Sequence, residues 1–163
     1  MWDTDMVQML RYLIGDVDSP QSYTDDRLKI QVLVGAKFVV PAFNFSQIFR
    51  VNLTAQTLSP DPTIDPTTDD WFTNLTVYKA AIILLQNELR TSSFQSVSFK
   101  EFNTSVDLRD VAKNKKVLLD ALTAEFEHAE LEYRMGVRIS GAAILTPFGI
   151  LNSMRGESRG RYC

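Results

Sequence analysis

The sequence contains almost no cysteine or histidine: Cys163 is the only thiol and His128 the only imidazole among 163 residues. A single thiol forms no intramolecular disulfide, so a reduced, intracellular environment is the simpler expectation. His128 has no second imidazole or thiolate close to it in sequence, which disfavours a metal site. The sequence therefore predicts no metal and no cofactor, with Cys163 as a bystander.

Common catalytic motifs are also missing. There is no glycine-rich phosphate loop, no GxSxG and no CxxC. The acidic pairs in SYTDDRL and TTDDWF stand at expected helix starts, where carboxylates cap free amides. We expect no catalytic residue and no enzyme. One alternative is a metal-dependent enzyme built on His128 and the glutamates around it, although a solvated helix face is the favoured interpretation.

Long hydrophobic runs and charge of one sign are absent as well. The run AAIILL is too short to cross a bilayer, and the acidic start MWDTDMVQML lacks the basic region of an export signal. The 17 basic and 20 acidic residues are mixed along the chain, so no basic stripe is present to hold duplex DNA. We expect neither membrane association nor avid nucleic-acid binding. Phe43, Phe45 and Phe49 could stack on bases, but such clusters are more often core.

The hydrophobic content of 45% allows one soluble domain with a real core. A first helix is expected near the N-terminus, with Asp3 as its N-cap and a hydrophobic staple between Trp2 and Val7. Gly15 is its expected end. Its apolar face would carry Met6, Leu10, Leu13 and Ile14.

The next segment, Ser19 to Val40, is ambiguous by period, because Leu28, Ile30, Val32 and Val34 alternate as in a strand. Start signals and length favour a helix from Asp25 to Val40, capped by Thr24, supported by an Asp25–Lys29 pair and stopped by Pro41. Its heavy apolar content predicts burial on several sides, by the core or by a neighbouring subunit.

Further elements follow from the same signals. A half-buried strand is expected from Phe49, followed by a proline-rich loop, and an extended piece, Ser96 to Phe102, could pair with that strand. Between them we expect an amphipathic helix from Asp69 or Asp70, whose apolar stripe consists of Trp71, Leu75, Tyr78, Ile82, Leu85 and Leu89. A last helix is expected from Asp107 to Met135, closed by Gly136, with an apolar stripe of Leu118, Leu122, Phe126, Ala129 and Tyr133.

The expected fold is mainly α: a small bundle of about four helices, a short hairpin-like β element and an extended C-terminal tail. We expect a helical domain over residues 1–136 and a partner-binding tail over residues 137–163. The tail has no helical stripe and ends in a basic segment, so we expect a partner to order it.

The order of elements, with the phrases LRYLIGDVDSP, YTDDRLKIQVLVGAKFVV, TLSPDPT, DDWFTNLTVYKAAIILL and SVSFKEFNTSVDL, resembles the head-to-tail connector, or adaptor, proteins of tailed bacteriophages. The resemblance covers roughly Trp2 to Tyr133 and includes no catalytic signature. It implies a non-enzymatic virion protein of the neck region, assembled in the host cytoplasm.

Members of that family form a ring, commonly a dodecamer, beneath the portal protein. The ring extends the channel through which genomic DNA passes without sequence-specific binding, and it docks the next neck or tail protein. The resemblance thus implies portal contacts in the basic tail, at Arg155, Arg159, Arg161 and Tyr162. Contacts between subunits are expected at Ile30, Val34 and Phe38. The alternative neck role is a stopper or tail terminator, which is usually richer in β structure.

Overall fold

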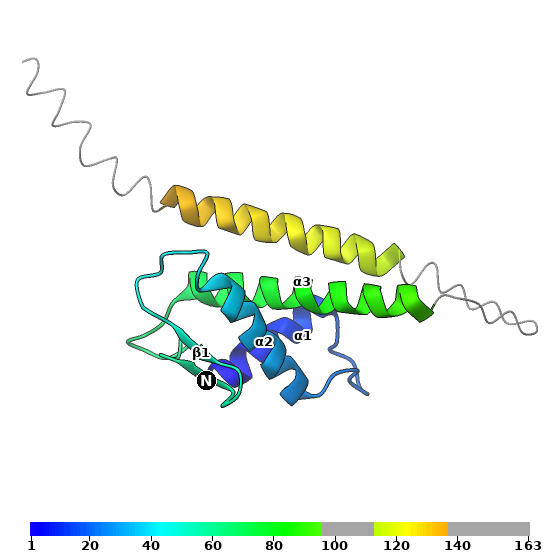
Figure 1. The fold of residues 1–163 in the computed structure, drawn as a ribbon, viewed down its shortest axis with the longest axis horizontal. Coiled ribbons are helices and arrows are strands. Elements are labelled where there is room, and N and C mark those ends of the chain that lie inside the picture. Colours follow the sequence, from blue (N-terminus) through cyan, green and yellow to red (C-terminus); the bar gives the residue numbers. More distant parts are fainter. Residues whose placement is uncertain (96–112, 137–163) are drawn as a thin grey trace, which may run out of the picture. The chain divides into compact units, whose positions relative to one another are not determined.

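The computed structural model describes residues 1–95 and 113–136, and the side chains of residues 1–91 and 113–136. It is mainly helical with one short hairpin, which confirms the predicted fold class for this part of the chain (Figure 1). Three helices are α1 (Trp2–Ile14), α2 (Asp25–Val39) and α3 (Asp70–Gln95), the strands are β1 (Arg50–Asn52) and β2 (Thr57–Ser59), and residues 113–136 form a further helix.

The chain divides into two compact units, Met1–Glu127 and His128–Cys163. The predicted division at residue 136 stays a prediction. The predicted pairing of Ser96 to Phe102, the start of the last helix at Asp107 and the C-terminal tail lie outside the described residues.

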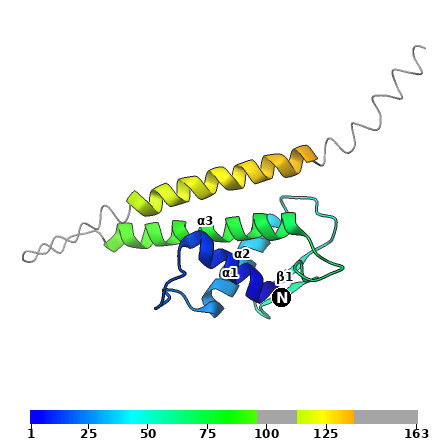
Figure 2. The same ribbon diagram turned by 180° about the vertical axis from the view of Figure 1, so that it is seen from behind.

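Helix α3 is the centre of the core. Phe72, Leu75 and Val77 are fully buried although they point in different directions around the helix. The expected single stripe is therefore wrong at its start, because Trp71 is exposed and its neighbour Phe72 is buried. Helices α1 and α2 both contact α3 and each other, as the views from either side show (Figures 1 and 2). We expected α2 to be buried on several sides. Within the described part of the chain, the helix buried in this way is α3.

Helix α2 runs from Asp25 to Val39, close to the predicted bounds, and is capped by Thr24, whose hydroxyl accepts a hydrogen bond from the Arg27 amide at 3.4 Å. It crosses α3 at Gly35. A Cβ atom added there would lie 2.7 Å from the Thr76 carbonyl oxygen and 2.9 Å from the Ala80 amide nitrogen. Only glycine permits this close approach of the two backbones.

The β element differs from the expected one. Strand β1 ends at Asn52 and pairs antiparallel with β2, so that Val51 stands opposite Leu58. The alternating pattern beyond Asn52 belongs to the turn instead. There the Asn52 side chain accepts hydrogen bonds from the amides of Thr54 and Ala55, each at 3.0 Å, which reverses the chain.

The first helix begins two residues earlier than expected, at Trp2. Asp3 lies inside α1 and does not cap it, because the Met1 carbonyl already accepts the Thr4 and Asp5 amides, each at 3.0 Å. Gly15 ends the helix in the left-handed conformation, with φ of 73°, as glycine readily does. Met6 and Leu10 are buried as expected, whereas Leu13 and Ile14 are only partly buried.

Within the larger unit, residues 113–127 of the last helix pack against α3. Lys115 forms an ion pair with Glu88 at 2.9 Å, and the ammonium group of Lys79 lies 5.0 Å from the centre of the Phe126 ring. Leu122 is buried, and Leu118 and Phe126 are partly buried, which agrees with the predicted stripe in this part of the helix.

Candidate interaction surface

The outer face of α2 carries the three residues that we expect at a subunit interface. Ile30 is 43% exposed, Phe38 is 58% exposed, and Val34 between them is partly buried. They are four residues apart, so they form one stripe along the helix. Because the residues on the other side of α2 are buried against the core, the stripe is the surplus apolar surface of this helix. We call these three residues the α2 stripe.

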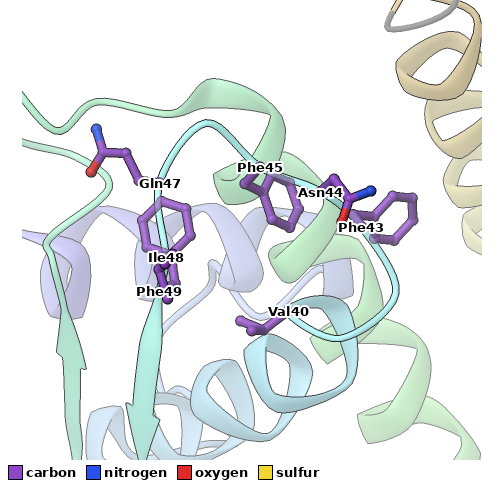
Figure 3. A pocket seen from close by; sticks show the side chains of 7 residues that line it. All are labelled: Val40, Phe43, Asn44, Phe45, Gln47, Ile48 and Phe49. Carbon is purple, nitrogen blue, oxygen red and sulfur yellow. The ribbon is translucent and has the colours of Figure 1, made fainter.

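Beside the end of α2 lies a pocket of about 190 Å³ (Figure 3). Its lining side chains come from Val40 and from the loop between α2 and β1, and include Phe43, Phe45 and Phe49. Ile48 at its edge is 84% exposed, the largest fraction among the exposed large apolar side chains of the described residues. Apolar surface therefore also lies just beyond the C-terminal end of the α2 stripe.

The phenylalanines of this loop are part of the core. Phe49 stacks on Phe72 with their ring centres 3.8 Å apart, and Phe45 meets Phe72 edge to face at 5.2 Å. Phe43 and Phe49 are buried. Rings that are packed on one another offer little face for a nucleobase, so this geometry favours the core interpretation over base stacking.

A buried ion-pair network positions α2 against α1. The guanidinium group of Arg11 donates to Asp16 at 2.6 Å, to Asp25 at 2.6 Å and to the Tyr23 carbonyl at 2.9 Å. Asp16 in turn accepts the Ser22 amide at 2.7 Å. Burying Arg11 and Asp16 is tolerated because each is paired and hydrogen-bonded.

This network also corrects the expected Asp25–Lys29 pair. Asp25 pairs with Arg11, and Lys29 lies 3.6 Å from Asp3 of α1. Sequence spacing pairs Asp25 with Lys29 along one helix. Instead, each of the two pairs with a residue of α1 and so links α2 to α1. The sequence signal that was missed is a single arginine on the apolar side of α1.

The start of α1 is held by a carboxylate from a distant loop. Asp61 accepts the Trp2 amide at 3.1 Å and the Thr63 amide at 2.9 Å. Partial burial acts to raise the pKa of Asp61, but the hydrogen bonds from Thr63 and Trp2 outweigh it and lower that pKa below 3.8. At the same end, the amino group of Met1 donates to Asp5 at 2.9 Å, and this bond raises the pKa of the amine.

The two acidic pairs differ: the pair at the start of α3 supplies a cap, whereas Asp25 and Asp26 lie in the first turn of α2, which Thr24 caps instead. The Asp69 carboxylate caps α3 by accepting the Phe72 amide at 2.9 Å. His128 is exposed and lies 3.8 Å from Glu132 one turn later on the same helix. Among residues 1–95 and 113–136, no three His, Cys, Asp or Glu side chains gather closely enough to hold a metal ion.

The four residues expected to bind the portal, Arg155, Arg159, Arg161 and Tyr162, lie outside the described residues. Over the part of the chain that is described, no helix is long and apolar enough to cross a membrane. Comparison with protein-family models, with curated proteins and with solved structures finds no match to this chain.

Proposed function

We propose that this chain is a structural subunit of a phage neck, a head-to-tail adaptor that forms a ring under the portal protein. The α2 stripe is the observation that carries the proposal. A chain with a well-packed core still leaves Ile30 and Phe38 exposed in one row, on a helix otherwise held firmly in place. Rows of this kind are typical of surfaces that pack against another protein.

Two further features support the proposal, and the first of them favours the adaptor over the other neck roles. The described chain is mainly helical, whereas stopper and tail-terminator subunits are usually richer in β structure. The chain as a whole carries a net charge of −3, and like charge discourages contacts with the phosphates of passing DNA. The adaptor's partners are further copies of itself, the portal and the next neck or tail component.

Deletion of the basic tail tests whether it contacts the portal. Deletion of residues 151–163 removes Arg155, Arg159 and Arg161, and we expect the shortened chain to keep its helical circular dichroism but not to join portal-bearing heads of the same phage. A matched full-length variant with the three arginines replaced by lysine keeps the charge and is expected to retain most of the binding. If the chain without residues 151–163 joined heads normally, the assignment of the portal contact to the tail would be refuted.

A further inference from the structure

The end of α2 and the loop after it form the longest uncharged stretch of the described residues. This stretch runs from Phe38 to Phe49, and it supplies every side chain that lines the pocket beside α2 (Figure 3). The lining side chains are apolar except for the amides of Asn44 and Gln47. The pocket therefore favours an uncharged occupant, because a charge that lost its water there would find no opposite charge among the lining side chains.

The size of the pocket suits a side chain and not a small molecule. Its volume is about 190 Å³, whereas pockets that hold drug-sized ligands measure about 300–1,000 Å³. Its wall is held in place, because Phe49 is buried and stacks on Phe72 of the core. Ile48 at its edge is exposed, so the pocket is open to a partner on that side. A fixed aromatic wall that is open on one side suits an apolar anchor from another protein segment.

The chain itself contains a segment that meets these requirements. Residues 139–154, ISGAAILTPFGILNSM, form the longest uncharged run of the whole sequence, and they lie outside the described residues. Pro147, Gly141 and Gly149 disfavour a helix, and the residue before a proline is biased toward an extended backbone. Phe148 is the only aromatic side chain of the run. Aromatic side chains are enriched at the centres of protein interfaces, so Phe148 is the expected anchor.

The position of the pocket indicates a neighbouring copy as the source of this segment. The pocket begins at Val40, two residues after Phe38, so it continues the apolar surface of the α2 stripe, which the proposed ring assigns to the next subunit. Each copy carries both the pocket and residues 139–154. A contact between the two is therefore head-to-tail: every pair still has a free pocket and a free segment, and copies can add until a ring closes.

We infer that residues 139–154 of one copy bind as an extended segment to the pocket of the next copy, with Phe148 as the side chain that fills it. The inference rests on the proposed function for the choice of a neighbouring copy. It also adds to that function. The segment ends one residue before Arg155, so its binding holds the basic end of the tail beside a boundary between two subunits, where the portal can contact it.

Disulfide trapping between two full-length variants tests this contact. Both carry Cys163→Ser, which removes the only natural thiol; one adds Ile48→Cys at the edge of the pocket, and the other adds Ile150→Cys. In an extended segment Ile150 points the same way as Phe148, about 7 Å further along, which brings its thiol within disulfide reach of the pocket's edge. When the reduced variants are mixed in equal amounts and then oxidised mildly, we expect the mixed disulfide-linked dimer as the main product on a non-reducing gel.

The matched control moves the first cysteine away from the pocket, to Val17→Cys in the linker between α1 and α2, where the side chain is 51% exposed. Each trapping rate is divided by the rate at which the same thiol reacts with a small disulfide reagent, which corrects for exposure. We expect the control to react with Ile150→Cys at least about tenfold more slowly. Adding Phe148→Ala to the tail variant is expected to slow trapping at Ile48→Cys by a similar factor, whereas Val137→Ala, just before the run, leaves the rate unchanged.

A chain that carries both Ile48→Cys and Ile150→Cys distinguishes the source of the segment, and we expect disulfide-linked dimers and larger species from it. Disulfides formed only within single chains would overturn the inference. So would a trapping rate equal to that of the Val17→Cys control, or one that Phe148→Ala does not change. Trapping between copies without capture of portal-bearing heads would refute the adaptor function alone, whereas rings on the portal without trapping would refute this contact alone.

Discussion

At the scale of single residues, Thr76 carries a fully buried hydroxyl with no hydrogen-bond partner in the described part of the chain. An unpaired buried hydroxyl costs about 1–3 kcal/mol. We expect Thr76→Val, which replaces the hydroxyl by a methyl group of similar size, to raise the free energy of unfolding by about 1 kcal/mol in urea titration.

Thr76→Ala is the control for this prediction, because it removes the hydroxyl and the methyl group together and leaves a void. We expect it to lower the free energy of unfolding by about 1 kcal/mol. If the valine variant is instead less stable than the natural chain, the hydroxyl has a partner.

Asp61 makes the stability of the fold depend on pH. Its folded-state pKa lies below the ordinary value of 3.8, so the ionised carboxylate stabilises the fold at neutral pH. That contribution is lost as the pH falls through the folded-state pKa. We expect Asp61→Asn to be less stable at neutral pH by about 1 kcal/mol, as for a lost helix cap.

Thermal unfolding of both proteins between about pH 6 and about pH 2 measures this effect. The difference between the natural chain and Asp61→Asn is expected to shrink toward the acid end, because the natural carboxyl is then protonated too. A difference that stays constant over the whole range would show that ionised Asp61 does not support the start of α1.

At the scale of elements, Gly35 sets the distance between α2 and α3. A Cβ atom there would meet backbone atoms of α3, which do not move aside as a flexible side chain does. We expect Gly35→Ala to lower the free energy of unfolding by about 3 kcal/mol, at the upper end for overpacked cores. Gly136→Ala is the control, since nothing lies within 4 Å of its added methyl group. Equal stability of the two variants would contradict the close crossing.

The ion pairs of Arg11 connect α1 to α2. Arg11→Met leaves the buried carboxylate of Asp16 without its charge partner, so we expect a loss of about 3 kcal/mol on urea unfolding. Asp25→Asn is the matched control: it alters the same network at a side chain that is 68% exposed, where a pair contributes about 1 kcal/mol or less. Similar losses in both variants would mean that burial does not decide the strength of these pairs.

At the scale of the whole molecule, local signals were enough for the starts of α2 and α3 and for the fold class, but not for the start of α1. Thr24 and Asp69 cap the next turn of their own helices, so sequence spacing alone identifies them. The partners of Asp25 and Lys29 were not predictable in this way, because both partners lie on α1 and only the packing of α1 on α2 brings them near.

For the expected interface residues too, local spacing was predictable from sequence and tertiary contacts were not. Helical spacing placed Ile30, Val34 and Phe38 in one row, but it could not decide which side of α2 the core covers. The contact of Gly35 with α3 shows which side of α2 faces the core, and the row lies on the other side. The helix that is buried on several sides within the described chain is α3.

The central claim is that copies of this chain form a ring on the portal. Negative-stain imaging of the purified full-length chain, with and without the portal protein of the same phage, tests it most directly. We expect rings with an open channel that stack coaxially on the portal, and no rings when Phe38 of the α2 stripe is replaced by glutamate. Particles that remain single subunits in the presence of the portal would contradict it.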